Sequence, residues 1–190
     1  MPHDTATNYP GIIIRMKTPT ESVMFPPLVN EALGQIAALP TGQKLLTGIA
    51  ARVANAKFGY TVCIMRADMT WDPGCVTKWK GTNVATRGNE LDAVTPGMSS
   101  ITAIKYNANM IVSPDGNRPS WVGLAHELIH AYYNLKGKGK PAGMVMNVSG
   151  MVEQEELATV GLGPGPHRSI TENKIRQEAH LPARTTYGGK

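Results

Sequence analysis

The 190-residue sequence predicts a single α+β domain in which a small mixed sheet packs against one strongly apolar helix. Apolar residues recur at helical spacing in several segments, whereas two other segments are rich in β-branched and aromatic residues and lack that spacing. The length is that of one domain with a core large enough to fold without disulfides. We expect residues 1 to 27 to form a partly ordered arm and residues 28 to 190 to form the functional domain.

The individual elements follow from local patterns. Helices are expected over residues 28 to 39, 41 to 54, 121 to 135, 152 to 160 and 170 to 180. Strands are expected over residues 12 to 14, 58 to 65, 100 to 106 and 110 to 112. Thr41 and Ser120 are the expected N-caps of two helices, and Pro182 follows the end of the last one. The turn-rich stretch 68 to 96 receives no assignment.

Composition and charge exclude several classes of protein. Hydrophobic residues make up 42% of the chain and charged residues 17%, which excludes a wholly disordered chain. The net charge of +5 is spread along the chain, apart from a cluster at Lys136, Lys138 and Lys140. Cations just after a helix complement its dipole, so this cluster needs no acidic partner. We expect a monomer that binds neither nucleic acid nor membranes.

The two cysteines and the N-terminal residues bear on the compartment. Cys63 and Cys75 are too few for a disulfide scaffold and are expected to be free thiols in a reducing compartment. Residues 1 to 10 lack the basic and apolar regions of a signal peptide, and no segment approaches the roughly 18 apolar residues of a membrane span. Sec-type export and membrane anchoring are therefore disfavoured.

The most informative motif is His-Glu-x-x-His at residues 126 to 130. His126 and His130 lie one turn apart on the predicted helix, so both imidazoles can reach one metal ion, and zinc suits them best. Glu127 then lies beside the ion, where a carboxylate can serve as general base toward a water molecule. The alternative, two surface histidines at helical spacing by chance, is disfavoured because the chain has only 5 histidines.

A third protein ligand must come from elsewhere. The extended motif with three histidines needs glycine at position 133 and histidine at position 136, where this chain has Tyr133 and Lys136. The other common solution is a glutamate from a downstream helix. The candidates are Glu153, Glu155 and Glu156, although glutamates at a helix start also simply favour the helix dipole. For Glu153 alone, the dipole explanation is the better one.

Two segments resemble motifs of known zinc peptidases. The H-E-L-I-H-A segment from His126 and the E-E-L-x-T-x-G segment from Glu155 are similar to the zinc motifs of clostridial neurotoxin light chains, and more closely to those of NleD-type effector zinc metallopeptidases. The resemblance implies a zincin-like fold, with Glu156 as the third zinc ligand and Glu155 as its support. The interval between His130 and the glutamate pair is shorter here than in the neurotoxins.

Further motifs extend the resemblance over residues 100 to 187. Arg184-Thr-Thr-Tyr187 resembles an R-x-x-Y motif whose arginine and tyrosine are implied to stabilise the oxyanion, although a frayed basic tail has the same composition. A Thr-Glu-Asn segment implies that Glu172 orients a ligand histidine. Glu172 has rival explanations, a capping box that begins at Ser169 and a helical ion pair with Arg176.

Other parts of the chain match no motif. We recognise no resemblance in residues 1 to 99. The remaining histidines, His3, His167 and His180, belong to none of the motifs above. His167 lies in a glycine- and proline-rich loop, for which a solvated side chain is the simplest expectation.

Together, these features predict a zinc endopeptidase of the gluzincin type, with one catalytic Zn²⁺ ion. The resemblance implies a bacterial effector that is delivered without a Sec signal and cleaves proteins, possible host signalling kinases among them, in the cytosol of a target cell. One alternative is an antibacterial toxin peptidase or amidase that acts on a competitor cell. Another is a non-catalytic zinc-binding interaction protein, against which Glu127 counts because a structural zinc site needs no base.

Overall fold

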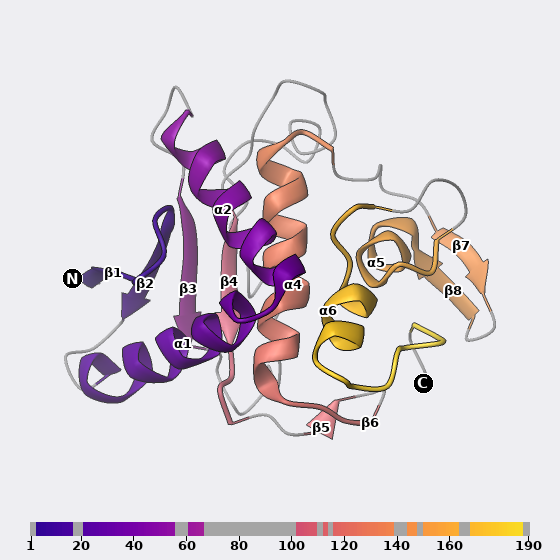
Figure 1. Cartoon of the computed structure of the whole chain (residues 1–190), viewed down its shortest axis with the longest axis horizontal. Coiled ribbons are helices and arrows are strands. Elements are labelled where there is room, and N and C mark those ends of the chain that lie inside the picture. Colours follow the sequence, from indigo (N-terminus) through magenta and orange to yellow (C-terminus); the bar gives the residue numbers. More distant parts are fainter. Residues whose placement is uncertain are drawn as a thin grey trace.

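The computed structural model describes residues 3–16, 21–55, 61–66, 102–109, 112–113, 116–138, 144–147, 150–163 and 168–187. Its main sheet has the order β1-β2-β3-β4 (Figure 1). The four strands are β1 His3–Ala6, β2 Ile12–Met16, β3 Val62–Arg66 and β4 Ala103–Tyr106. β1 and β2 are antiparallel, and the other two pairs are parallel. The predicted small mixed sheet is thus confirmed.

Side chains alternate between the two faces of this sheet. Ile14, Ile64 and Ile104 are fully buried in the main core, where the helices cover the sheet. Cys63 and Ala103 point to the opposite face and form a separate small cluster. This period of two is the physical reason why short β-branched segments are stable as strands here.

Helix α1 spans Glu21–Ala37, so the boundary that was expected at residue 27 falls inside it. Pro26 and Pro27 lie within the helix, and the prediction of a helix start at residue 28 is wrong. Burial explains the difference, because Phe25 is buried on the same face as Val29 and Leu33. Packing of this apolar stripe outweighs the local cost of proline. Residues 3–16, expected to hold one strand, contain two.

Helix α2 spans Pro40–Ala54 and begins with proline at its first position. The N-cap is Leu39 without a side-chain hydrogen bond, so the prediction of Thr41 as N-cap is wrong. Thr41 instead donates its backbone N–H and its hydroxyl to the carboxylate of Glu178, at 2.8 and 2.5 Å. A distant glutamate therefore does what a local cap was expected to do.

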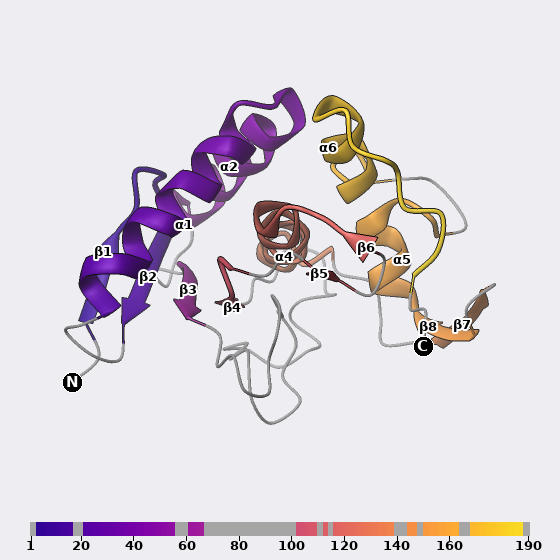
Figure 2. The ribbon, with the colours of Figure 1, turned by 90° about the horizontal axis from the view of Figure 1, so that it is seen from below.

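Helix α4, Ser120–Leu135, runs through the middle of the molecule and contacts α1, α2, β4, α5 and α6 (Figures 1 and 2). Almost its whole length is buried, the motif residues included. Pro119 rather than Ser120 occupies the N-cap position, and the Ser120 hydroxyl shares a 2.9 Å hydrogen bond with the Tyr106 hydroxyl. The helix ends where Gly137 adopts a left-handed φ of 58°, a conformation that favours glycine.

The C-terminal part consists of small elements around one side of α4 (Figure 2). They are β5 Val112–Ser113, β6 Gly116–Asn117, β7 Met144–Asn147, β8 Gly150–Glu153, α5 Gln154–Val160 and α6 Glu172–Glu178. The helix expected from residue 152 begins only at Gln154, because Val152 and Glu153 pair with β7. The last helix is shorter than expected and is capped by Thr171, which accepts from the N–H of Lys174.

Some predictions cannot be compared with the structure. The stretch 68 to 96, Cys75 and His167 lie outside the described residues. Cys63 is a free, buried thiol, and burial raises its pKa to about 11, which keeps it protonated and unreactive. Within the described ranges, no helix has the length and apolar character that crossing a bilayer requires.

Candidate metal centre

Three side chains that could hold a metal ion meet beside the middle of α4. His126 and His130 are one turn apart on α4, and Glu156 comes from the first turn of α5. The two Nε2 atoms are 3.1 Å apart, and Oε2 of Glu156 lies 3.0 Å from that of His126 and 3.3 Å from that of His130. The structure thus brings together the three residues that the motifs selected.

These distances fit a tetrahedral zinc site. Ligands at about 2.0–2.1 Å from a tetrahedral ion are separated from one another by about 3.3 Å. The observed separations of 3.0 to 3.3 Å form one triangular face of such a site. Three electron-pair donors at this distance repel one another unless a cation or proton lies between them. The donor set therefore suits one zinc ion whose fourth position is left open by the described side chains.

Two further carboxylates orient the imidazoles. The Nδ1–H of His126 donates to Glu172 at 2.7 Å, and that of His130 donates to Glu155 at 3.0 Å. With both Nδ1 atoms occupied as donors, both Nε2 lone pairs point toward Glu156. Burial lowers the pKa of His130, but the carboxylates of Glu156 and Glu155 outweigh this and raise it to about 10 when no cation is bound.

Glu155 is held by an arginine that the motifs did not reveal. Arg168 forms a two-pronged ion pair with Glu155, at 2.7 and 2.6 Å, and also donates to the Thr159 hydroxyl at 3.0 Å. Its guanidinium lies 4.0 Å from the centre of the Tyr133 ring. Burial raises the pKa of Glu155, but the hydrogen bonds from His130 and Arg168 outweigh it and lower the pKa to about 2. Glu155 thus stays ionised although it is buried.

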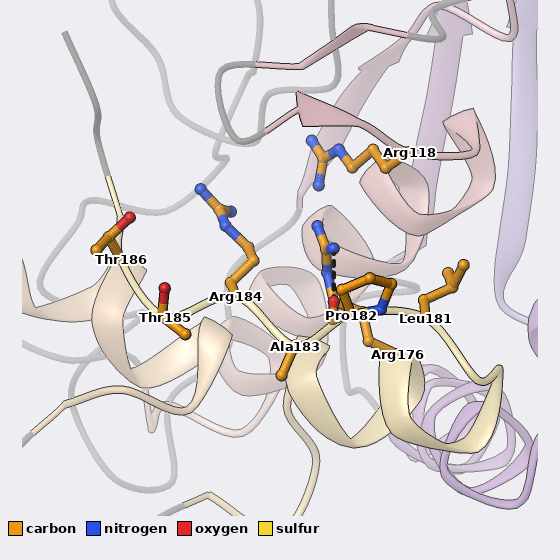
Figure 3. A pocket seen from close by; sticks show the side chains of 8 residues that line it. All are labelled: Arg118, Arg176, Leu181, Pro182, Ala183, Arg184, Thr185 and Thr186. Carbon is orange, nitrogen blue, oxygen red and sulfur yellow. Dashed lines mark hydrogen bonds between the residues drawn. The ribbon is translucent and has the colours of Figure 1, made fainter.

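Glu172 sits at the first position of α6 and is completely buried. The capping-box explanation is wrong, because Thr171 caps the helix, whereas the predicted ion pair with Arg176 is present at 2.6 Å. Arg184 approaches the same carboxylate at 3.3 Å and Arg118 at 3.6 Å (Figure 3 shows the three arginines). Although burial opposes it, the hydrogen bond to His126 and the charges of His126, Arg184 and Arg118 lower the pKa of Glu172 well below its usual range.

Glu127 and Tyr187 lie close to the three donor atoms. Glu127 is buried, with 7% exposure, and its charge contributes to raising the pKa of both His126 and Tyr187. The Tyr187 ring stacks near the His126 ring, with centroids 6.1 Å apart. Burial, together with the charge of Glu156 and a hydrogen bond to it, raises the pKa of the Tyr187 phenol, which therefore keeps its proton. A protonated phenol beside the site can donate a hydrogen bond.

Arg184 is positioned through its backbone. The Asn173 side chain donates to the carbonyl of Arg184 at 2.9 Å and accepts from its N–H at 2.8 Å. This reciprocal pair ties the segment after α6 to the helix. The Arg184 guanidinium lies 4.6 Å from the centre of the Tyr187 ring, so both residues of the R-x-x-Y segment reach the site. The alternative of a frayed basic tail does not describe this segment.

The other candidate residues belong to further elements, and two arginines were missed. Glu153 is a strand residue of β8, His180 is exposed beyond the end of α6, and His3 belongs to the edge strand β1. Arg118 and Arg168 were missed because an arginine gives no local signal that it will be buried beside a carboxylate. The one available signal is indirect: Glu155 and Glu172, once buried, require positive partners, and these two arginines supply them.

Structural comparison places the fold among clostridial toxins. The chain is similar to the light chains of botulinum neurotoxins type G (TM-score 0.54, 18% identity) and type D (0.58, 13%), which it matches over 92% and 90% of its own length. It is also similar to the serotype F light chain of Clostridium botulinum (0.53, 14%, 79% of this chain). It spans 58%, 58% and 54% of these three chains. At such identities the likeness establishes the zincin-like fold.

Sequence comparison supplies the family. No curated protein matches the chain. The family model Peptidase_M91, described as "Effector protein", matches residues 15–187, which includes every residue of the candidate site. The match also begins well before residue 100, where the motif resemblance started. The predicted relationship to the NleD-type effector peptidases is thereby confirmed, and the chain belongs to the Peptidase_M91 family of effector proteins.

Proposed function

We propose that the protein is a zinc-dependent endopeptidase, a bacterial effector that cleaves proteins inside a target cell. The observation that carries this proposal is the triangle of donor atoms at 3.0 to 3.3 Å, with Glu127 buried beside it, in a chain of a peptidase family. His126, His130 and Glu156 would hold the ion. Glu155 and Glu172 hold the two imidazoles in the required orientation.

The remaining residues divide the chemistry among them. A zinc ion in this site would polarise the scissile carbonyl and acidify a water molecule. Glu127 takes the proton of the attacking water and passes it to the leaving amine. Tyr187 keeps its own proton and donates a hydrogen bond to the carbonyl oxygen as that oxygen becomes negative. Arg184, beside the Tyr187 ring, adds a fixed positive charge.

The alternative of a purely structural zinc site is less consistent with these contacts. A structural site usually closes all four positions with protein ligands, and it needs neither a neighbouring base nor a phenol. Here the described donors number three, and Glu127 and Tyr187 lie next to them. Host signalling kinases are the candidate protein substrates that the family resemblance suggests.

Replacing Glu127 with glutamine tests the proposal. The variant should keep zinc and fold normally, because no donor is removed, while its kcat/KM falls at least about 10²-fold with the loss of the general base. Glu31→Gln makes the same change at an exposed position of α1 and should leave activity unchanged. Metal content is measured alongside, so that loss of zinc is distinguished from loss of the base.

The substrate is found by comparing lysates. Zinc-loaded protein and the Glu127→Gln variant are incubated with eukaryotic and with bacterial lysates, and new protein N-termini are sequenced. New termini with the active protein alone support an endopeptidase, and the lysate in which they arise separates an effector on host proteins from an antibacterial toxin. Identical termini in both samples would contradict the proposed activity.

A further inference from the structure

A cavity of about 210 Å³ opens beside α6 and the segment that follows this helix. Arg118 comes from the segment before α4, Arg176 from α6, and the remaining wall from residues 181–186, which include Arg184. Figure 3 shows the three guanidinium groups extending toward the same space. This space is large enough for a small charged group. We call it the arginine pocket.

Positive charge is concentrated at the arginine pocket. Three guanidinium groups lie around the Glu172 carboxylate, at 2.6 Å for Arg176, 3.3 Å for Arg184 and 3.6 Å for Arg118. The Glu172 oxygens are already engaged by Arg176 at 2.6 Å and by His126 at 2.7 Å. The Arg176 and Arg184 side chains are only 6% and 7% exposed, so water screens them weakly. An anion in the pocket would weaken the repulsion among the three guanidinium groups.

Arg118 supplies the most direct sign of a missing ligand. Its Nη1 atom is buried and has no hydrogen-bond partner within the part of the chain that the structure describes. The nearest carboxylate oxygen, Oε1 of Glu172, is 3.6 Å away, which is beyond hydrogen-bond distance. Arg176 and Arg184 contact that carboxylate more closely, at 2.6 and 3.3 Å. A buried guanidinium donor of this kind is satisfied by an oxygen that enters the pocket.

We propose that the arginine pocket binds the carboxylate or phosphate group of a residue close to the scissile bond of the protein substrate. This inference rests on the proposed peptidase function. A planar guanidinium presents paired N–H donors that match the oxygens of either group. The pocket adjoins the metal centre, because Glu172 contacts His126 on one side and because Arg184 both lines the pocket and contacts the Tyr187 ring. Arg118 is accordingly a specificity residue.

A binding experiment tests the pocket without any cleavage. Inorganic phosphate and acetate are titrated into zinc-loaded Glu127→Gln protein, and Arg118→Gln and Arg52→Gln are each added to that background. Arg52 is exposed on α2 and controls for the loss of one positive charge. Both anions also bind metals, and this binding is the same in the two double variants. The measured quantity is therefore the difference in anion affinity between them. Arg118→Gln should weaken binding of the preferred anion about tenfold, the factor for one charge-assisted hydrogen bond.

A cleavage experiment then tests specificity. Peptide libraries place acidic, phosphorylated and neutral residues at each position around the scissile bond. The wild-type protein should favour an acidic or phosphorylated residue at one position, by about tenfold in kcat/KM, and Arg118→Gln should lose that preference, which is measured within each variant as the ratio of kcat/KM between the acidic and the neutral peptide. Arg118→Lys, which keeps the charge without the planar donor pair, should recover part of it. Comparison of the acidic with the phosphorylated peptides decides whether the pocket binds a carboxylate or a phosphate group.

The outcomes separate the two proposals. Cleavage with the same preference in wild type and Arg118→Gln would overturn the arginine pocket and leave the peptidase function intact. Absence of any cleavage, together with phosphate or acetate binding that depends on Arg118, would overturn the peptidase function and retain the anion site. Equal anion binding by the Arg118→Gln and Arg52→Gln double variants would overturn the anion site. The melting temperature of each variant identifies any failure to fold.

Discussion

The two sides of α4 are built from different interactions. On the N-terminal side, the sheet and helices α1 and α2 meet in an aliphatic core in which residues such as Leu33 and Ile64 are fully buried. On the C-terminal side, α5, α6 and the segment after them bury charged groups, and Glu155 and Glu172 are paired there with arginines. Helix α4 presents apolar residues to the first side and the candidate metal ligands His126 and His130 to the second.

This difference separates stability from function. Apolar burial has no direction and tolerates shifts, so it stabilises the fold without specifying the position of any one atom. Buried ion pairs lose most of their attraction to desolvation, and they add little net stability. What they provide here is orientation, because each imidazole at the metal centre is held by a carboxylate that is itself held by arginine. The two sides should therefore respond differently to mutation.

The largest effect is expected from Arg168→Met. This change leaves the Glu155 carboxylate buried without its main counter-charge, which should cost about 3–5 kcal/mol of unfolding free energy and should also weaken zinc binding. Urea denaturation with and without zinc measures both. Arg52→Met at an exposed position of α2 is the control and should change stability by less than about 0.5 kcal/mol. A loss below about 1 kcal/mol for Arg168→Met would contradict the described ion pair.

A comparable loss of stability without a metal defect is expected from Leu33→Ala. The fully buried side chain leaves a cavity in the aliphatic core, at a cost of about 2–5 kcal/mol. Because no contact of the metal centre is removed, the zinc dissociation constant of the folded variant should stay within about twofold of wild type. Val23→Ala, at a side chain that is 69% exposed, serves as control. A strong loss of zinc affinity in Leu33→Ala would show that the two sides are not separable.

A smaller effect concerns pH. Zinc must displace the proton of His130, whose pKa is raised to about 10, so zinc affinity should rise about tenfold per pH unit, at least, between pH 6.5 and 9. When a chelator has removed the metal, the stability of the fold changes with pH in the opposite direction. There the protonated His130 stabilises the fold fully below its unfolded pKa of 6.5, and that contribution is lost as the pH rises through about 10.

Competition with a chelator at several pH values measures the slope. Leu33→Ala should keep the wild-type slope. Glu155→Gln removes one carboxylate that raises the pKa of His130, so the zinc affinity of this variant should stop rising at a lower pH. An affinity that does not change with pH in the wild-type protein would mean that His130 binds no proton in the metal-free state.

The sequence alone determined the parts of this protein that depend on neighbours in the chain. The spacing of His126 and His130 on an apolar helix predicted the metal site, since residues four apart share a helix face. Alternating β-branched segments predicted the mixed sheet, and the paired glutamates together with the R-x-x-Y segment predicted the family. These signals are readable because each rests on one or two turns of local structure.

Tertiary structure decided what depends on distant partners. The start of α1 passes through Pro26 and Pro27 because Phe25 packs in the core, and Thr41 meets Glu178 from the other end of the chain. The Glu172 carboxylate accepts a hydrogen bond from His126 and does not cap the start of its own helix. Arg118 and Arg168 acquire their roles only from the buried charges that the fold brings to them. Long-range packing and the requirement to compensate buried charge, neither of which has a local sequence pattern, set these positions.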